Sequence, residues 1–279
     1  MSKDFLVANE ASFIKKVEAI RAGGFENLHV LTDFDKTLTR AVVDGVETPS
    51  LISVLRREGY LTPDYPARAQ ALFDKYYPIE INHDISREEK AVAMDEWWHA
   101  HFDLLIECGL TKDDVEKATR SHSVRLRAGV KEFMEKMHME NVPIVIISAA
   151  ASGRESIEFY LREQNLLLDN VHIVSNGFKW DEQGKAIDIE KPVIHTVNKN
   201  EAVLHEYYFY DQIKERKNVL LFGDALEDVF MVEGLEHDNI LKIGFLNKKI
   251  EENRDKFLEA YDAVVVGDGD FSEITKIHL

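Results

Sequence analysis

The chain has 279 residues, 45% of them hydrophobic and 30% charged, a composition typical of a folded protein with a full hydrophobic core rather than of a disordered chain. Its formal net charge of −17 comes from 34 Lys and Arg against 51 Asp and Glu, and this excess of acid argues against a nucleic-acid polymer as partner. Because Cys108 is the only cysteine and no stretch is long and apolar enough to span a bilayer, we expect a cytoplasmic protein without disulfides or membrane contact.

The first predicted elements are a helix and a short strand. Ser12 is the expected N-cap of a helix that carries Phe13 and Val17 on one face and ends at Gly23. The apolar residues 28–32 then predict a buried strand.

Two carboxylates follow this strand. Asp33 lies at or just past its carboxyl end, the edge at which ligands bind in open α/β sheets. Because side chains alternate along an extended chain, Asp33 and Asp35 can face one point while Phe34 turns into the core. Two carboxylates aimed at one point repel each other unless a cation or a shared proton lies between them, and a hard cation such as Mg²⁺ is the simplest explanation. On this stretch alone, a strand followed by a polar turn is an equally good interpretation.

From about residue 48 to residue 122 the sequence patterns are helical. The predicted helix starts are Thr48-Pro49, Tyr65, the capping box Ser86 to Glu89, and Thr111 with Asp114. An insertion of roughly 75–80 residues between two strands is long for a plain crossover. We therefore expect a helical cap domain over residues 45–125, inserted into an α/β core formed by residues 1–44 and 126–279.

From Gly129 onward, strands and helices alternate, which predicts a parallel sheet. The expected strands are 142–147, 171–174, 218–222, 240–244 and 263–266. The expected helices are 155–163, 201–216 and 226–234, and residues 181–185 are typical of a hairpin turn.

Two of these strands lead into segments whose residues could form a binding or catalytic site. The strand 142–147 leads into small residues from Ser148 to Gly153, whose backbone N–H groups can approach a phosphate. Taken alone, a closely packed turn explains that segment better. The strand 218–222 ends in Asp224 and Asp228, for which a solvated acidic helix start is the alternative. We prefer a site, because an apolar strand aimed at acids occurs twice in the chain.

These motifs, in this order, resemble the haloacid dehalogenase phosphatase superfamily. The matching residues are Asp33-x-Asp35-x-Thr37, Ser148 and Gly223-Asp224-x-x-x-Asp228. The resemblance implies an α/β fold, with a haloacid dehalogenase-like Rossmannoid parallel sheet core and an inserted α-helical cap domain. It also implies that Asp33 is the nucleophile and that Asp35 is the general acid and base.

The same resemblance implies a magnesium site and a phosphate site. Asp33, the backbone carbonyl of Asp35, and Asp224 would bind Mg²⁺, while Asp228 would hold a metal-bound water or orient a lysine. The phosphate would be bound by residues from two later segments, namely Ser148, Ala149 and Lys199. Lys191 is the competing candidate for the lysine.

The helical insertion resembles one branch of the superfamily, the cytosolic pyrimidine 5′-nucleotidases (the cytosolic 5′-nucleotidase III family). The matching segments are 75–80, 88–90, 94–98, 174–176 and 195–199. In that family the residue at the position of Glu80 binds the base. An aromatic residue of the long cap helix stacks near the base, and the resemblance places it at Trp98. A nearby polar position of the family lies close to His101. Core packing is the alternative for at least one of Trp97 and Trp98.

The predicted function is a Mg²⁺-dependent 5′-nucleotidase that hydrolyses nucleoside 5′-monophosphates through an aspartyl phosphate. We expect a pyrimidine substrate, CMP or UMP, with 7-methylguanosine monophosphate as the main alternative base. Two rivals remain: a phosphatase of another small phosphomonoester such as phosphoserine, and a nucleotide-binding protein without catalysis. We expect a monomer or a weak homo-oligomer.

Overall fold

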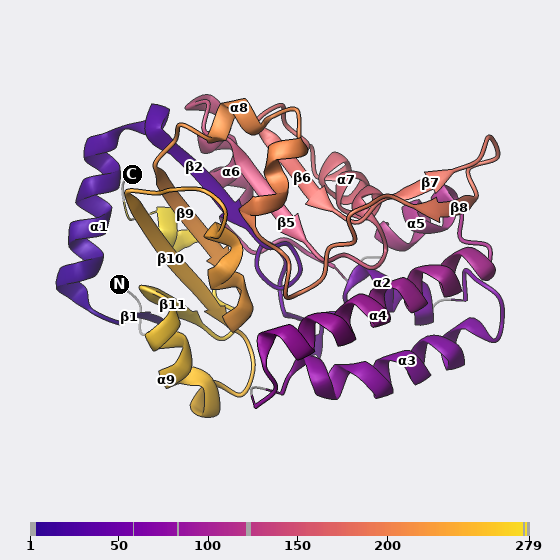
Figure 1. Ribbon diagram of the computed structural model, residues 1–279. Helices are drawn as coiled ribbons and strands as arrows, with labels where there is room; N and C mark the ends of the chain where they lie inside the picture. The colour runs from indigo at the N-terminus through magenta and orange to yellow at the C-terminus, as the bar shows by residue number, and fades with distance from the viewer. Residues whose placement is uncertain (1–3, 58, 83, 121–123, 276, 278–279) are drawn as a thin grey trace.

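Nearly continuous apolar strands form the centre of the molecule, which we describe from a computed structural model covering residues 4–57, 59–82, 84–120, 124–275 and 277. Seven strands pair in the order β1-β11-β10-β9-β2-β5-β6 (Figure 1). They are β1 (Phe5–Val7), β2 (Leu28–Thr32), β5 (Ile144–Ser148), β6 (Val171–Ser175), β9 (Asn218–Gly223), β10 (Asn239–Leu246) and β11 (Ala263–Val266). All neighbours pair in parallel except β1, which joins β11 antiparallel at one edge. The parallel α/β sheet predicted from the sequence is confirmed, whereas the sequence analysis missed β1.

Helices cover both faces of the sheet, and alternate strand residues separate the two layers. Val30 and Ile146 pack with residues of α1 (Glu10–Gly23), α6 (Val130–Met139) and α7 (Arg154–Glu163) on one face. Leu31 and Ile147 point the other way, toward α8 (Tyr210–Ile213) and α9 (Ile250–Ala260). This two-residue alternation places one helical layer on each side of the sheet. A last short helix, α10 (Ser272–Thr275), follows β11.

Three predictions about helices in this core are wrong. Asn9, not Ser12, is the N-cap of α1, because its side chain accepts the Ser12 N–H at 2.9 Å. The predicted helix 201–216 is instead a 3-10 segment (Glu201–Glu206) followed by the four-residue α8. An extended residue, Tyr207, interrupts the helix, and Phe209, two residues later, is buried against the ring of His172. Tertiary packing therefore overrides the helical pattern there. The predicted helix 226–234 is also a 3-10 segment, Leu226–Val232.

The interval between β2 and β5 holds the predicted helices. They are α2 (Leu51–Arg57), α3 (Tyr65–Glu80), α4 (Arg87–Glu107) and α5 (Lys112–Thr119), preceded by a small hairpin of β3 (Val42–Val43) and β4 (Val46–Glu47). Both predicted capping boxes, at Ser86 and Thr111, are present. The first helix begins at Leu51 rather than at Pro49, because the Thr48 N–H bonds back to the Ala41 carbonyl at 2.8 Å.

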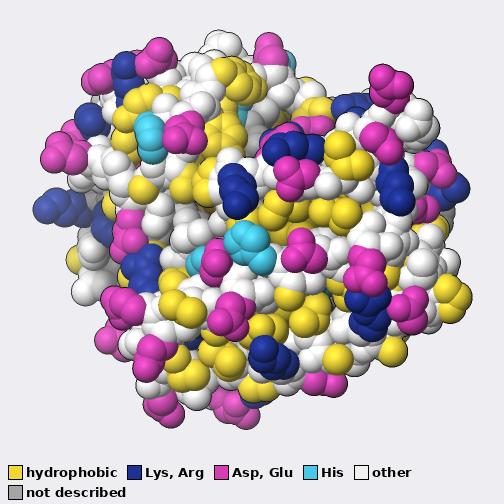
Figure 2. All heavy atoms as spheres, turned by 45° about the vertical axis from the view of Figure 1, so that its right-hand side comes forward, with side chains coloured by type: hydrophobic (Ala, Val, Ile, Leu, Met, Phe, Trp, Pro, Cys, Tyr) yellow, Lys and Arg dark blue, Asp and Glu magenta, His cyan; other side chains and the backbone are white. Residues whose placement is uncertain are grey.

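These helices share one hydrophobic cluster with a second hairpin. The hairpin consists of β7 (Phe178–Trp180) and β8 (Ala186–Ile189), and its turn is the predicted one. Figure 1 shows α2, α3 and α4 close together beside the sheet, toward the edge where β2 and β5 end. Figure 2 shows side chains of both charges spread over this side of the molecule, with hydrophobic side chains gathered near its middle. Among the described helices, none combines the length and the hydropathy that a bilayer crossing requires.

Candidate active site

Adjacent strands bring two distant acidic motifs together. β2 and β9 pair in parallel with Thr32 opposite Phe222, so Asp33 and Asp224 leave the same edge of the sheet one and two residues later. The Asp33 N–H still bonds the Phe222 carbonyl at 3.0 Å. The side chain of Phe34 turns away into the core and meets the ring of Tyr160 edge-on. The chain direction at the strand end therefore presents the acids to one side, as the alternation predicts.

Three carboxylates form a tight group at this edge. One oxygen each from Asp33, Asp224 and Asp228 lies within 4.8 Å of the others. Burial raises the pKa of Asp224 well above its usual value, and the charges of Asp33 and Asp228 raise it further. Such a group resists full ionisation without a cation, and three carboxylate oxygens are ligands that suit a hard divalent ion. The donors present at this edge therefore fit a metal ion.

Lys199 lies inside this acidic group. Its buried ammonium donates to the Asp228 carboxylate at 2.9 Å and also contacts Asp33. Burial alone would lower its pKa, but the charges of Asp228 and Asp33 outweigh that effect, so the pKa is raised and the lysine stays charged. The competing candidate, Lys191, is exposed. The sequence analysis gave Asp228 two alternative roles, to hold a metal-bound water or to orient a lysine. The structure shows its contact with Lys199.

Asp228 is held by the chain as well as by the lysine. Its second oxygen accepts the N–H groups of Asp224 and Ala225, each at 3.0 Å. These bonds fix the carboxylate toward Lys199 at the start of the segment after β9. Asp35, by contrast, is not a member of the three-carboxylate group among the described residues.

Asp35 carries an altered acidity. Burial raises its pKa to about 7, and the nearby charge of Asp33 contributes to the rise. A carboxyl group with such a pKa can hold and release a proton near neutral pH, which is what a general acid and base requires.

A buried network anchors the segment that follows Lys199. Glu201 lies between two imidazoles, with His29 Nε2 at 3.0 Å from one of its oxygens and His237 Nε2 at 2.6 Å from the other. Burial raises the pKa of Glu201, but the bonds from His237 and His29 outweigh it and leave the pKa lowered. The ionised carboxylate thereby ties the lysine-bearing segment to β2.

One cavity of about 760 Å³ connects the acidic edge with the helical insertion. The ten residues that the sequence analysis preferred as site residues all line it: Asp33, Asp35, Glu80, Trp98, His101, Ser148, Ala149, Lys199, Asp224 and Asp228. Ser148 is the last residue of β5, and it enters the cavity beside the acids because β5 is the other neighbour of β2. Side chains from α2, α3 and α4 close the far side.

The far side of the cavity carries the predicted base-binding residues. Burial raises the pKa of Glu80, in the last turn of α3, to about 7, against a hydrogen bond from Thr196 that lowers it. The Trp98 indole donates to the Ala149 carbonyl at 3.1 Å. Burial lowers the pKa of His101 to about 4, so its ring is neutral, and it pairs with the Tyr65 hydroxyl at 3.1 Å.

Both tryptophans line the cavity, and they differ in their partners. Trp97 stacks on Tyr76 with ring centroids 5.9 Å apart, whereas Trp98 reaches the small-residue loop after β5.

The sequence analysis missed two residues next to the acids, Asn247 and Arg127. Asn247 follows β10 directly, so the rule that ligands bind at the carboxyl edge could have found it. Arg127 carries no comparable signal, because only the folded chain brings it to the Lys36 and Thr37 carbonyls.

The sheet order, the acids at two strand ends and the helical insertion define a haloacid dehalogenase-like protein. A phosphoserine phosphohydrolase-like protein from Francisella tularensis has the same fold, with a TM-score of 0.55 and 17% identity over 90% of this chain and 99% of that one. The structure of cytosolic 5′-nucleotidase IIIB bound to cytidine matches far more closely, with a TM-score of 0.87 and 28% identity over 99% and 93% of the two chains.

The sequence identifies the family within that fold. The model of the pyrimidine 5′-nucleotidase (UMPH-1) family matches residues 36–278. The 7-methylguanosine phosphate-specific 5′-nucleotidase of Gallus gallus is 36% identical over 90% of this chain and 87% of that protein, and its Homo sapiens counterpart is 34% identical over 90% and 84%. The chain belongs to the pyrimidine 5′-nucleotidase family, and it is a 5′-nucleotidase hydrolase.

Proposed function

We propose that this enzyme is a Mg²⁺-dependent 5′-nucleotidase that hydrolyses nucleoside 5′-monophosphates through an aspartyl phosphate. The observation that carries the proposal is the single cavity, with Asp33, Asp35 and Lys199 at one end and Glu80 and Trp98 at the other. A phosphate group at the acidic end leaves room for a base between the helices. The membership of the chain in a 5′-nucleotidase family supports this assignment.

The reaction follows from the protein's own residues. Asp33 attacks phosphorus, and the bond from phosphorus to the ribose oxygen breaks as the aspartyl phosphate forms. Asp35 gives its proton to the departing ribose oxygen, and it then takes a proton from the water that cleaves the aspartyl phosphate. Phosphate leaves, and Asp33 is regenerated.

Charge on the phosphoryl oxygens is neutralised by three groups of the chain. Lys199 supplies a fixed positive charge, Ser148 a hydroxyl donor, and Ala149 a backbone N–H. Asp33, Asp224 and the Asp35 carbonyl would hold Mg²⁺, which would supply further positive charge and offset the repulsion among the carboxylates.

The base is read at the far end of the cavity. An ionised Glu80 accepts hydrogen bonds only, so it favours a base that presents donors, such as the amino group of cytosine. N7-methylguanine also presents donors, and its positive charge is attracted to an aromatic face such as that of Trp98. Relatives named for 7-methylguanosine phosphate and a related structure bound to cytidine support both candidates. We place CMP first and 7-methylguanosine monophosphate second.

A panel assay tests this function. Phosphate release is measured with CMP, UMP, 7-methylguanosine monophosphate, AMP and phosphoserine, each with Mg²⁺ and with a chelator. Mg²⁺-dependent turnover of a nucleoside monophosphate well above that of phosphoserine supports the proposal. Preferred turnover of phosphoserine would support the rival phosphatase, and no turnover of any compound would support the non-catalytic rival.

We also propose that residues 45–125 act as a cap that closes over the substrate in the cytosol. The shared hydrophobic cluster of α2 to α5 supports a separate unit. Because the β7–β8 hairpin packs into the same cluster, the cap has a fixed support on the core. Names of relatives that include the word cytosolic support the location.

A further inference from the structure

Arg127 is the buried residue that joins the helical insertion to the acidic loop. It lies where the chain returns from the insertion, and the residue is only 2% exposed. The outgoing and returning segments pair here, with the Arg127 N–H on the Leu38 carbonyl at 2.9 Å and the Arg40 N–H on the Arg125 carbonyl at 2.8 Å. This pair of segments connects the insertion to the core along the chain, beside the acidic loop.

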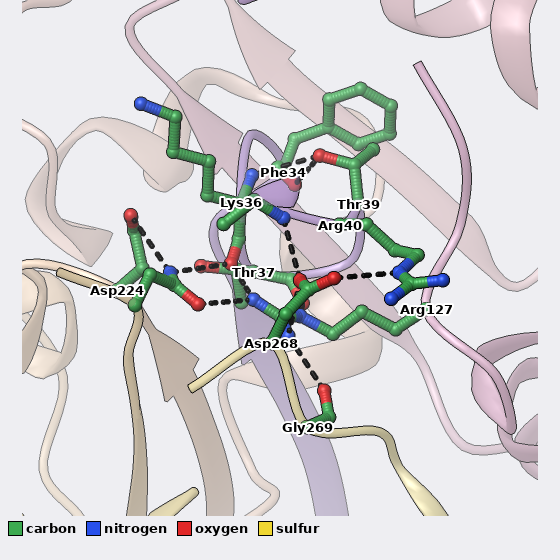
Figure 3. Close-up of polar contacts among 11 residues, drawn as sticks. Phe34, Lys36, Thr37, Thr39, Arg40, Arg127, Asp224, Asp268 and Gly269 are labelled. Atoms are coloured by element: carbon green, nitrogen blue, oxygen red, sulfur yellow. Dashed lines mark hydrogen bonds and ion pairs between the residues drawn. The ribbon is translucent and has the colours of Figure 1, made fainter. Parts of the chain in front are cut away.

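The guanidinium of Arg127 uses all five of its N–H donors (Figure 3). The acceptors are the carbonyl oxygens of Thr37 (2.9 Å), Lys36 and Gly269 (2.6 Å), the Asn247 amide oxygen (2.7 Å) and the Asp268 carboxylate (3.3 Å). The ring of Phe245 lies against the same group, 4.5 Å from its central carbon. A side chain satisfied on every donor has one orientation, and it holds its acceptors in one arrangement.

These acceptors come from three segments that surround the acids. Lys36 and Thr37 directly follow Asp35, and Lys36 has a φ of 62°, a left-handed conformation that is uncommon for a residue with a side chain. The Asn247 amide group donates to the Lys36 carbonyl at 3.1 Å and lies 3.5 Å from an Asp224 oxygen. Arg127 and Asn247 therefore support the strained turn, and Asn247 also reaches the acidic group.

We propose that Arg127 is a positioning residue of the active site. Through the Lys36 and Thr37 carbonyls it places Asp35, and through Asn247 it places Asp224. The inference rests on the proposed function for its kinetic consequences, but its effect on divalent-ion binding does not. Lysine cannot substitute, because it has three donors on one atom instead of a planar fork of five.

Arg127→Lys tests the proposal against Arg125→Lys. Arg125 lies two residues away in the same linker and is exposed, and its side chain pairs with Asp44 on the surface. With CMP and with p-nitrophenyl phosphate, Arg127→Lys should lower kcat per folded molecule by about 10–100-fold and change KM much less. Mg²⁺ affinity, measured by calorimetry on the free protein, should fall by about 10–100-fold. Arg125→Lys should leave both unchanged.

Two further measurements separate positioning from folding. Arg127→Ala should regain part of its kcat when millimolar guanidinium is added, and circular dichroism gives the folded fraction. If the Arg127 variants do not fold, Asn247→Ala takes their place and should weaken Mg²⁺ binding with no guanidinium rescue.

The proposal is overturned if Arg127→Lys keeps parental kcat and Mg²⁺ affinity with only a lower melting temperature, or if Asn247→Ala in its place binds Mg²⁺ as the parent does. A parent enzyme that releases no phosphate from any substrate refutes the proposed function instead, and calorimetry then still decides the role of Arg127.

Discussion

The Trp98 indole donates a hydrogen bond to the Ala149 carbonyl at 3.1 Å, which links α4 directly to the small-residue loop after β5. The base end and the phosphate end of the cavity are therefore connected through one side chain. Trp98→Phe keeps an aromatic ring but removes the donor, and a net hydrogen bond contributes about 0.5–1.5 kcal/mol. We expect KM for CMP to rise by roughly 2- to 10-fold. Steady-state kinetics measure this, and Trp97→Phe, which keeps its stacking on Tyr76, should change KM less.

Asp33→Asn should abolish turnover while the fold is kept. The amide has nearly the same shape as the carboxylate but cannot attack phosphorus, so kcat should fall by about 10⁴-fold or more. Phosphate release and circular dichroism check activity and fold together. Hydrolysis near the parental rate by the pure variant would show that Asp33 is not the nucleophile.

Asp224→Asn should weaken metal binding and stabilise the metal-free protein. The neutral amide is a poorer ligand for a hard cation, so the Mg²⁺ concentration for half-maximal activity should rise by about 10-fold or more. The folded state raises the pKa of Asp224 well above that of the unfolded chain, so its charge destabilises the fold at neutral pH. Removing that charge should raise the melting temperature of the protein in the presence of a chelator, as measured by calorimetry. An unchanged Mg²⁺ activation curve would place Asp224 outside the metal site.

Glu80→Ala should flatten the base preference and spare the chemistry. In the proposed binding mode the acids contact only the phosphate, which every monophosphate shares, so discrimination among bases would depend on the cap. A buried polar group left without its partner costs about 1–3 kcal/mol, enough for a clear ranking of kcat/KM values. Turnover of p-nitrophenyl phosphate, which has no base, serves as the control. An unchanged ratio of CMP to AMP turnover would remove Glu80 from base recognition.

The base preference should also depend on pH, because burial raises the pKa of Glu80 to about 7. Since this is an acid with a raised pKa, Glu80 holds its proton below that value and is ionised above it. The protonated form can donate to the carbonyl that uracil presents, while the ionised form accepts from the cytosine amino group. The ratio of kcat/KM for CMP to that for UMP should therefore increase between about pH 6 and pH 8. Glu80→Gln, which cannot ionise, should give a ratio that does not vary with pH, and the same pH dependence in that variant would contradict the assignment.

Much of the site was predictable because each acid is placed by its own strand. Apolar residues before Asp33 and before Asp224 make buried strands, and a parallel sheet presents all strand carboxyl ends at one edge. The capping boxes at Ser86 and Thr111 and the hairpin turn at residues 181–185 are local features too, and the structure contains all three. The family resemblance within the helical insertion supplied Glu80 and Trp98, which periodicity alone does not single out.

Only the tertiary structure decided the features that depend on contacts between distant segments. The pattern of residues 201–216 is helical by itself, yet the burial of Phe209 against His172 breaks it. The pKa of Glu80 and the five acceptors of Arg127 arise from groups far away in the chain, which no local pattern records. Local propensity and strand polarity determine where a chemical group emerges from the sheet, whereas burial and partners across the fold determine its charge and orientation.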